Sequence, residues 1–270
     1  MIEQNPQVPM TMGKGSDTPL LSIVIPAYNE GAPDRLPQSL VEIVAFVEAQ
    51  DFPIEVVVVN NNSKDNTLDI ALAASRVHPY IRALTETTQG KGAAVKAGML
   101  TARGEYLFIC DADLSMPIGE VLKFLPPQLS DYDIAIASRE AKGSQRINEP
   151  EMRHIMGRVF NFIVKVIAVR GLNDTQCGFK CFRRDVALAL FPLQTIDGWA
   201  FDVELLFIAQ QHGYKIIEVP ITWIYKAQSK ISPIRDSINM VVETLRIRMK
   251  GWRGEYGDPR VTQKDRQPAP

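Results

Sequence analysis

The chain has 270 residues, of which 46% are hydrophobic and 23% are charged, and its net charge is −1. This composition is typical of a globular protein with a large buried core, and the near-neutral charge gives no field that would attract nucleic acid. Three cysteines are too few for a disulfide framework and fit a reducing compartment. No secretory signal peptide is expected at the N-terminus, and no apolar run reaches the roughly 20 residues of a membrane span.

Apolar segments alternate with segments of helical periodicity over the first half of the chain. Residues 1–19 are predicted to form a disordered tail. Strands are expected at 20–25, 54–59, 80–84, 105–110 and 132–137, and helices at 34–50, from about 67, and at 93–102. The second strand is apolar almost throughout, as buried parallel strands are. This alternation predicts an α/β fold with a doubly wound, mostly parallel sheet.

Two carboxylates, Asp111 and Asp113, follow the fourth strand directly. Open α/β sheets bind ligands at the carboxyl ends of their strands, and Mg²⁺ is often held by one or two carboxylates together with substrate phosphates. An Asp-x-Asp sequence also occurs by chance, so a plain polar strand end is the alternative interpretation.

Gly90-Lys91-Gly92 precedes the helix expected at 93–102. Exposed amides at the start of a helix, beside a lysine, suit an anion. The spacing is not that of a P-loop. The alternative is a flexible turn with a solvated lysine.

The second half of the chain is more basic. Between residues 139 and 170 there are seven basic and three acidic residues. The helical part, 159–169, is apolar nearly all round but too short to span a bilayer, so it is either a buried helix or a helix with one face near lipid; we expect the latter. A polar turn at 173–180 precedes a short strand, and residues 216–225 form a strand that Pro220 bends or places at an edge.

A last helix is expected to begin near Pro233. Its apolar residues follow one helical stripe, formed by Ile234, Ile238, Val241, Leu245, Met249 and Trp252. Residues 226–253 contain seven basic and two acidic residues. A basic amphipathic helix favours a lipid surface or an anionic partner, and the alternative is a stripe packed on the core with a solvated basic face. Residues 254–270 are expected to be disordered.

Several of these motifs together carry a family resemblance. In chain order they are Pro26-Ala27-Tyr28-Asn29-Glu30, Ser63-Lys64-Asp65-Asn66-Thr67, Gly90-Lys91-Gly92 and Asp111-Ala112-Asp113. Residues 20–225 therefore resemble a family-two glycosyltransferase domain with a GT-A fold. The segments 90–95, 174–180 and 199–204 are most similar to dolichyl-phosphate β-glucosyltransferases, which are polyprenyl-phosphate sugar synthases. The resemblance implies a C-terminal acceptor-side subregion, followed by the basic amphipathic helix at 226–253.

The resemblance also implies a donor site. The loop that holds the nucleotide would include Pro26, Tyr28 and Glu30. Further donor-binding residues would be Asn60, Lys91, Asp111 and Gln176, with Asp111 near the uridine or ribose and Gln176 at the metal or sugar. Asp113, together with Asp111, would hold Mg²⁺ or Mn²⁺ on the diphosphate. The family usually has aspartate where this chain has Asn60.

For the acceptor, Arg139 and Arg153 are the candidates to bind a phosphate, because arginine forks match phosphate oxygens. A sugar hydroxyl needs a nearby base, whereas a phosphate monoester, with a second pKa of about 6, is already ionised at neutral pH. The two arginines favour a lipid phosphate, while Asp202, also expected at the catalytic site, leaves a hydroxyl acceptor open.

The implied function is inverting, metal-dependent transfer of a hexose, with glucose from UDP-glucose favoured, to a polyprenyl or dolichyl phosphate. Transfer from GDP-mannose, a soluble sugar acceptor, and a non-catalytic sugar-nucleotide-binding module are the alternatives. The family's membrane anchors are not expected in this sequence, so the enzyme would be peripheral on the cytoplasmic face of a membrane.

Overall fold

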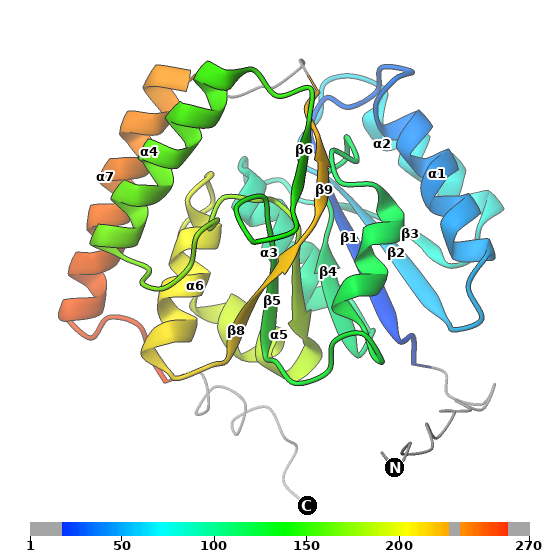
Figure 1. The fold of residues 1–270 in the computed structure, drawn as a ribbon. Helices are drawn as coiled ribbons and strands as arrows, with labels where there is room; N and C mark the ends of the chain where they lie inside the picture. The colour runs from blue at the N-terminus through cyan, green and yellow to red at the C-terminus, as the bar shows by residue number, and fades with distance from the viewer. Residues whose placement is uncertain (1–17, 227–232, 259–270) are drawn as a thin grey trace, which may run out of the picture.

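The structure is a computed structural model that describes residues 18–226 and 233–258 (Figure 1). The tails predicted at 1–19 and 254–270 lie mostly outside these ranges. The strands and helices predicted for the first half of the chain occur in the predicted order.

A seven-stranded sheet forms the centre of the molecule. Its strand order is β3-β2-β1-β4-β7-β5-β8, and only β7 runs antiparallel to its neighbours. The strands are β1 (Leu21–Ala27), β2 (Ile54–Asn60), β3 (Ile81–Thr85), β4 (Tyr106–Ile109), β5 (Ile134–Ser138), β7 (Lys180–Arg183) and β8 (Ile216–Pro220). The predicted mostly parallel, doubly wound sheet is confirmed.

A small second sheet pairs β6 (Gln145–Ile147) with β9 (Thr222–Ile224). The predicted strand at 216–225 is therefore two strands. β8 ends at Pro220, which cannot donate a ladder hydrogen bond, and the chain then joins the second sheet. The predicted edge or bend at Pro220 is confirmed.

Helices cover both faces of the central sheet (Figure 1). On one face lie α1 (Leu36–Glu48), α2 (Thr67–Val77) and the 3-10 helix η1 (Ile118–Phe124). On the other lie α3 (Lys91–Thr101), α5 (Arg184–Leu190) with η2 (Phe191–Leu193), and α6 (Phe201–Gln211). Gly98 of α3 allows a close approach to the sheet, since a Cβ there would lie 2.3 Å from a methyl carbon of Val24.

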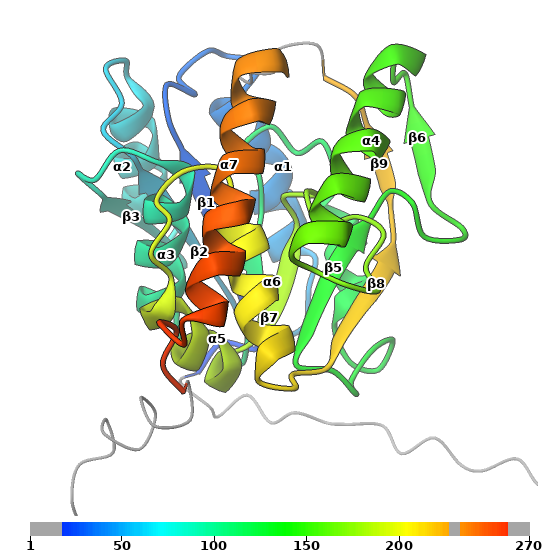
Figure 2. The same ribbon diagram turned by 90° about the vertical axis from the view of Figure 1, so that its left-hand side faces the viewer.

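Two long helices, α4 (Glu151–Ile167) and α7 (Pro233–Trp252), lie outside α6. Figure 2 shows them side by side on this flank of the molecule, and they contact each other. α4 begins eight residues before the predicted 159, because its polar first half lacks the apolar signal of the second half. α7 begins at Pro233 as predicted.

The apolar stripe expected on α7 does not pack on the core over its second half, which was the alternative interpretation, and the side chains of Ile234 and Ile238 lie outside the described residues. Leu245, Met249 and Trp252 are exposed, whereas a different set of residues faces the protein. This set is Met240, Thr244 and Ile247. The helix therefore has an apolar edge that the protein does not cover.

The carboxyl ends of β1, β2, β4 and β5 meet at one edge of the sheet. β7 is antiparallel, so its first residue, Lys180, lies at that same edge. Successive chain segments lie on opposite sides of β1, with β2 on one side and β4 on the other. Such a switch point is where open α/β sheets bind ligands.

Candidate active site

The turn after β4 carries both predicted aspartates. Leu114 N–H donates to the carbonyl of Asp111 at 3.2 Å, and Ser115 N–H donates to Asp113 Oδ1 at 2.9 Å. Leu114 has a φ of 48°, which is uncommon for a side chain of its size. Such strain persists where the surrounding structure enforces it, and it occurs often at functional sites.

Lys91 lies against this turn. Its Nζ is 2.6 Å from Asp111 Oδ1 and 5.4 Å from the ring centroid of Trp199. Burial would lower the pKa of Lys91, but the charges of Asp111, Asp202 and Asp113 outweigh burial and raise it. One ammonium therefore lies within electrostatic reach of all three predicted site carboxylates.

Asp113 is half-buried, and its pKa is raised by burial and then by the charge of Asp111. Lys226 donates to the backbone carbonyl of Asp113. A cation bound at this turn would favour the charged form of Asp113 and lower its pKa.

The segment before β7 closes on Asp111. A Cβ at Gly178 would lie 2.0 Å from Asp111 Oδ2, so only glycine leaves room for this carboxylate. Nearby in the chain, Gln176 Nε2 is buried and has no hydrogen-bond partner within the described ranges.

This donor set suits a hard cation. The described residues contain no group of three His, Cys, Asp or Glu side chains that could enclose a metal. Mg²⁺ is commonly held by one or two carboxylates with substrate phosphates, and Asp111 and Asp113 supply that number. The residues therefore fit a cation that binds together with a diphosphate.

The start of α3 does not form the predicted anion site. The amides of Gly92 and Ala93 donate to the carbonyl of Asp197, at 2.7 and 3.2 Å. Gly90 has a φ of 149°, and a Cβ there would lie 2.1 Å from the same carbonyl oxygen. Asp197 therefore caps the helix, and the side chain of Lys91 is what faces the site.

The loop after β1 is fastened to the loop after β2. Asn29 N–H donates to Ser63 Oγ at 3.0 Å, Lys64 N–H donates to Asn29 Oδ1 at 2.8 Å, and Glu30 N–H donates to Thr67 Oγ1 at 2.8 Å. The carboxylate of Glu30 pairs with Arg35 at 2.8 Å. The predicted nucleotide loop is thus rigidly held.

The other predicted donor residues lie at or after the carboxyl ends of β1 and β2. Pro26 lies in β1, partly buried, and Tyr28 is 38% exposed. Asn60 ends β2 opposite Ala27, and its buried Oδ1 has no hydrogen-bond partner among the described residues. An unpartnered buried carbonyl oxygen costs free energy unless a ligand supplies a donor.

Asp202 forms a buried ion pair with Lys180. Its Oδ2 is 3.1 Å from Lys180 Nζ, and its Oδ1 accepts the amide of Val203 at 2.8 Å. Lys180 Nζ also donates to the carbonyl of Cys177 at 2.5 Å. The sequence predicted Asp202 as a site residue but not Lys180 as its partner. The only sequence signal for Lys180 was its place two residues before Phe182, on the same face of a buried strand.

Arg139 is paired with Asp174. Its Nε and Nη2 donate to the two carboxylate oxygens at 2.7 and 2.9 Å, and the guanidinium lies 5.4 Å from the ring centroid of Trp223. Burial raises the pKa of Asp174, but Arg139 outweighs it and lowers that pKa to about 2. Arg153 lies in α4, and its side chain is outside the described part of the structure.

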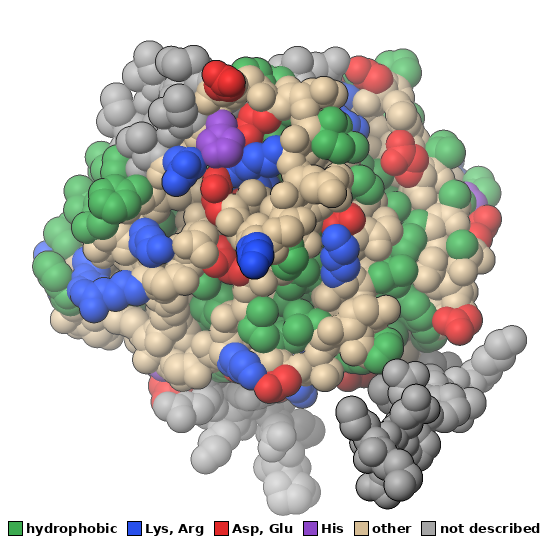
Figure 3. Space-filling model, in the orientation of Figure 1, with side chains coloured by type: hydrophobic (Ala, Val, Ile, Leu, Met, Phe, Trp, Pro, Cys, Tyr) green, Lys and Arg blue, Asp and Glu red, His purple; other side chains and the backbone are tan. Residues whose placement is uncertain are grey.

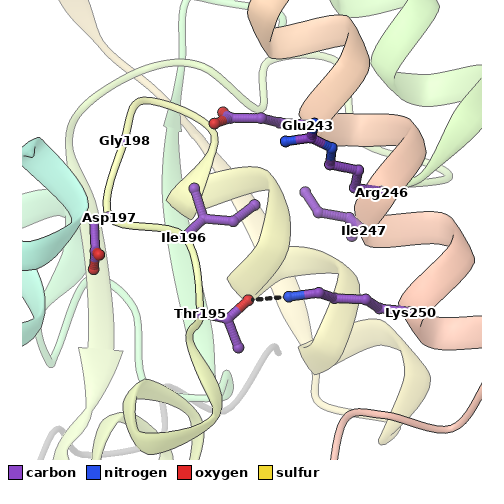
Figure 4. A pocket seen from close by; sticks show the side chains of 8 residues that line it. All are labelled: Thr195, Ile196, Asp197, Gly198, Glu243, Arg246, Ile247 and Lys250. Atoms are coloured by element: carbon purple, nitrogen blue, oxygen red, sulfur yellow. Dashed lines mark hydrogen bonds between the residues drawn. The ribbon is translucent and has the colours of Figure 1, made fainter.

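A cavity of about 360 Å³ lies away from these residues, between the 195–198 segment and α7. Figure 4 shows Thr195 and Lys250 across it, joined by a hydrogen bond of 2.6 Å. Glu204 accepts bonds from Thr195 and Ile196 and from the hydroxyl of Tyr256. These contacts hold the segment whose Asp197 carbonyl caps α3.

Comparison with known proteins agrees with this geometry. Residues 22–191 match the family described as "Glycosyl transferase family 2". The chain belongs to this family. It is 39% identical over 235 residues to a dolichyl-phosphate beta-glucosyltransferase of Drosophila melanogaster, covering 82% of this chain and 72% of that protein. A human protein of the same name is 34% identical over 256 residues, covering 89% and 78% of the two chains.

Solved structures share the fold. Glucosyl-3-phosphoglycerate synthase from Mycobacterium tuberculosis, in complex with Mn²⁺, UDP-glucose and phosphoglyceric acid, aligns with a TM-score of 0.58 at 16% identity, covering 87% of this chain and 80% of that one. Mannosyl-3-phosphoglycerate synthase from Rubrobacter xylanophilus aligns with a TM-score of 0.63 at 18% identity, covering 88% and 75%. The predicted GT-A fold, and a hexosyltransferase that resembles dolichyl-phosphate β-glucosyltransferases, are confirmed.

Proposed function

We propose that this glycosyltransferase transfers glucose from UDP-glucose to a polyprenyl phosphate of the dolichyl class. The convergence of Lys91, Asp111, Asp113 and Asp202 at the switch point of the sheet carries this proposal. Relatives named for dolichyl phosphate and glucose, at 34% and 39% identity, support the choice of both substrates.

In this proposal Asp111 and Asp113 hold Mg²⁺ or Mn²⁺ on the donor diphosphate. The cation would neutralise charge that builds on the leaving diphosphate. Lys91 adds a second positive charge on the same side, and Lys226, fixed to the Asp113 carbonyl, is close enough to the turn to add a third. The loop after β1, with Pro26, Tyr28 and Glu30, binds the nucleoside.

Asn60 and Gln176 contribute the two unpartnered polar groups. The Asn60 carbonyl would accept a donor N–H of the base, and the Gln176 amide would donate to the sugar or the diphosphate. Both groups then gain the hydrogen bonds that they lack.

The acceptor oxygen needs orientation more than deprotonation. A phosphate oxygen forms the new bond to C1 of glucose from the side opposite UDP, the old C1–O bond breaks, and UDP leaves with that electron pair, so the anomeric configuration inverts. Both oxygens of Asp202 already have partners, Lys180 and Val203, whereas a base must reach the proton that it removes. We therefore assign Asp202 to orienting the site.

Arg139 and Arg153 are the proposed phosphate-binding residues of the acceptor side. Because Asp174 holds two nitrogens of Arg139, this arginine would meet the acceptor in a fixed orientation. We further propose that the protein acts as a peripheral enzyme on the cytoplasmic face of a membrane. Within residues 18–226 and 233–258, no helix combines the length and hydropathy of a bilayer crossing.

A donor competition tests the proposal. The full chain, Mn²⁺ and detergent-dispersed polyprenyl phosphate are incubated with labelled UDP-glucose and unlabelled GDP-mannose, and then with the labels exchanged. Label in the organic phase from UDP-glucose, undiminished by GDP-mannose, is expected. Lipid label from GDP-mannose alone would contradict UDP-glucose as the donor. Label found only in a water-soluble sugar would contradict a lipid phosphate as the acceptor.

A further inference from the structure

The outer edge of α7 carries apolar side chains that the protein does not cover. Four of them are between 42% and 74% exposed, at spacings of three and four residues that keep them on one helix face. They are Val242, Leu245, Met249 and Trp252. The opposite edge faces the protein, where a Cβ added to Gly251 would lie 2.4 Å from the ring of Phe207. The exposed stripe is therefore separate from the face of α7 that packs on the protein.

The neighbouring helix α4 extends this stripe into a surface. Phe162 is 67% exposed and Val166 is 64% exposed, one turn apart on a helix that contacts α7. We call these two residues and the four of α7 the α4–α7 apolar surface. Figure 3 shows hydrophobic side chains gathered at the flank formed by these helices, with basic side chains beside them. Exposed apolar side chains that gather on one flank favour an interaction site there.

The charges on the two helices beside this surface are mostly positive. Residues 157–170 and 239–253 contain seven basic residues and one acidic residue, Glu243. The basic residues are Arg158, Lys165, Arg170, Arg246, Arg248, Lys250 and Arg253, of which Arg246 and Lys250 also line the cavity beside residues 195–198. The Arg248 guanidinium lies 5.2 Å from the ring centroid of Trp252, so a charge and the most exposed aromatic ring lie together.

We propose that the α4–α7 apolar surface docks the enzyme on a bilayer that contains anionic lipids. Its apolar side chains would enter the boundary between headgroups and acyl chains, and its basic side chains would meet lipid phosphates. A second copy of the chain is a poor occupant, because two basic surfaces would face each other. The inference deepens the proposed function and rests on it for the lipid acceptor.

The orientation agrees with that acceptor. α4 and α7 both begin at the end of the molecule where β1 and β4 end (Figure 1). A bilayer along these helices would therefore reach the edge of the sheet that carries Asp111 and Asp113. A polyprenyl phosphate could approach that edge while its chain stays in the bilayer.

Vesicle flotation of the full chain tests the docking surface. Vesicles of phosphatidylcholine alone are compared with vesicles that contain phosphatidylserine. The variant Leu245→Ser/Met249→Ser/Trp252→Ser removes exposed apolar side chains without touching the core. Its matched control is Val41→Ser/Val77→Ser, since these valines are 69% and 71% exposed on α1 and α2.

The wild type and the control are expected to bind the anionic vesicles, and the triple variant to bind at least about tenfold more weakly. Equal binding by the triple variant, or no binding by the wild type, would overturn the proposal. A wild-type dimer that the triple variant converts to a monomer would assign the surface to a second copy instead.

A transfer assay in detergent separates this inference from the proposed function. With detergent-dispersed polyprenyl phosphate, the triple variant should retain wild-type transfer, because no bilayer is involved. Transfer in detergent without vesicle binding would overturn only the docking surface. Vesicle binding without any transfer would overturn the proposed function and leave the surface intact.

Discussion

Substitution of Gly178 by alanine should disable the donor site without unfolding the protein. The new Cβ would lie 2.0 Å from Asp111 Oδ2, whereas ordinary contact begins at 3.4 Å, so the carboxylate must move by about 1.4 Å (3.4 − 2.0). That movement would break its 2.6 Å contact with Lys91. Misplacement by about 1 Å can cost roughly 100-fold in rate, or about 2.7 kcal/mol.

The assay is kcat/KM for glucose transfer, together with the affinity for UDP in the presence of Mn²⁺ by calorimetry. We expect both to fall, with kcat/KM lower by about 100-fold and the melting temperature nearly unchanged. Gly119→Ala is the control, because a Cβ there meets nothing within 4 Å. Wild-type kcat/KM and UDP affinity in Gly178→Ala would refute the reasoning, since the position of Asp111 would then not matter to the donor.

Three further predictions concern buried charges and the cation. Lys180→Met leaves Asp202 buried without its counter-ion and should lower the free energy of unfolding, measured in urea, by about 3–5 kcal/mol. The double variant Lys180→Met/Asp202→Leu should recover most of this loss, and no recovery would show that the two residues are not coupled. Glu55→Gln should lower the free energy of unfolding by about 2 kcal/mol, because Glu55 accepts hydrogen bonds from Ser22 and Arg103. Burial raises the pKa of Glu55, but these hydrogen bonds outweigh burial and lower it below its ordinary value of 4.5. The stabilisation is therefore complete above pH 4.5, and the difference between the two proteins should shrink as the pH falls below that value. A pH-independent difference would contradict this. Transfer should stop with a chelator and return with Mn²⁺ or Mg²⁺, while Asp113→Ala should stay inactive at any Mn²⁺ concentration; chelator-resistant transfer would exclude the cation.

The sequence was informative where the determining signal is local. Apolar runs predicted the parallel strands, and two carboxylates directly after such a run predicted a ligand site at the end of β4. Lys91 was predicted from its glycine neighbours, although these glycines serve a different purpose. They admit the Asp197 carbonyl, which comes from more than 100 residues later in the chain.

Contacts between distant segments were not readable in this way. Lys180 reaches the site because β7 is inserted antiparallel between β4 and β5, and no local pattern distinguishes an antiparallel strand of four residues from a parallel one. Periodicity likewise predicted an apolar stripe on α7 but not which edge packs. Met240 and Ile247 lie on the buried edge, while Leu245 and Met249, which also follow a helical spacing, lie on the exposed one.

The proposed phosphate acceptor is tested most directly by comparing two acceptors that differ only in that group. The wild-type chain, Mn²⁺ and labelled UDP-glucose are incubated with a polyprenyl phosphate or with the corresponding polyprenol, and label is counted in the organic phase. We predict labelled lipid with the phosphate and none with the alcohol. Equal labelling of both, or labelling of the alcohol alone, would contradict an acceptor that enters the site already ionised.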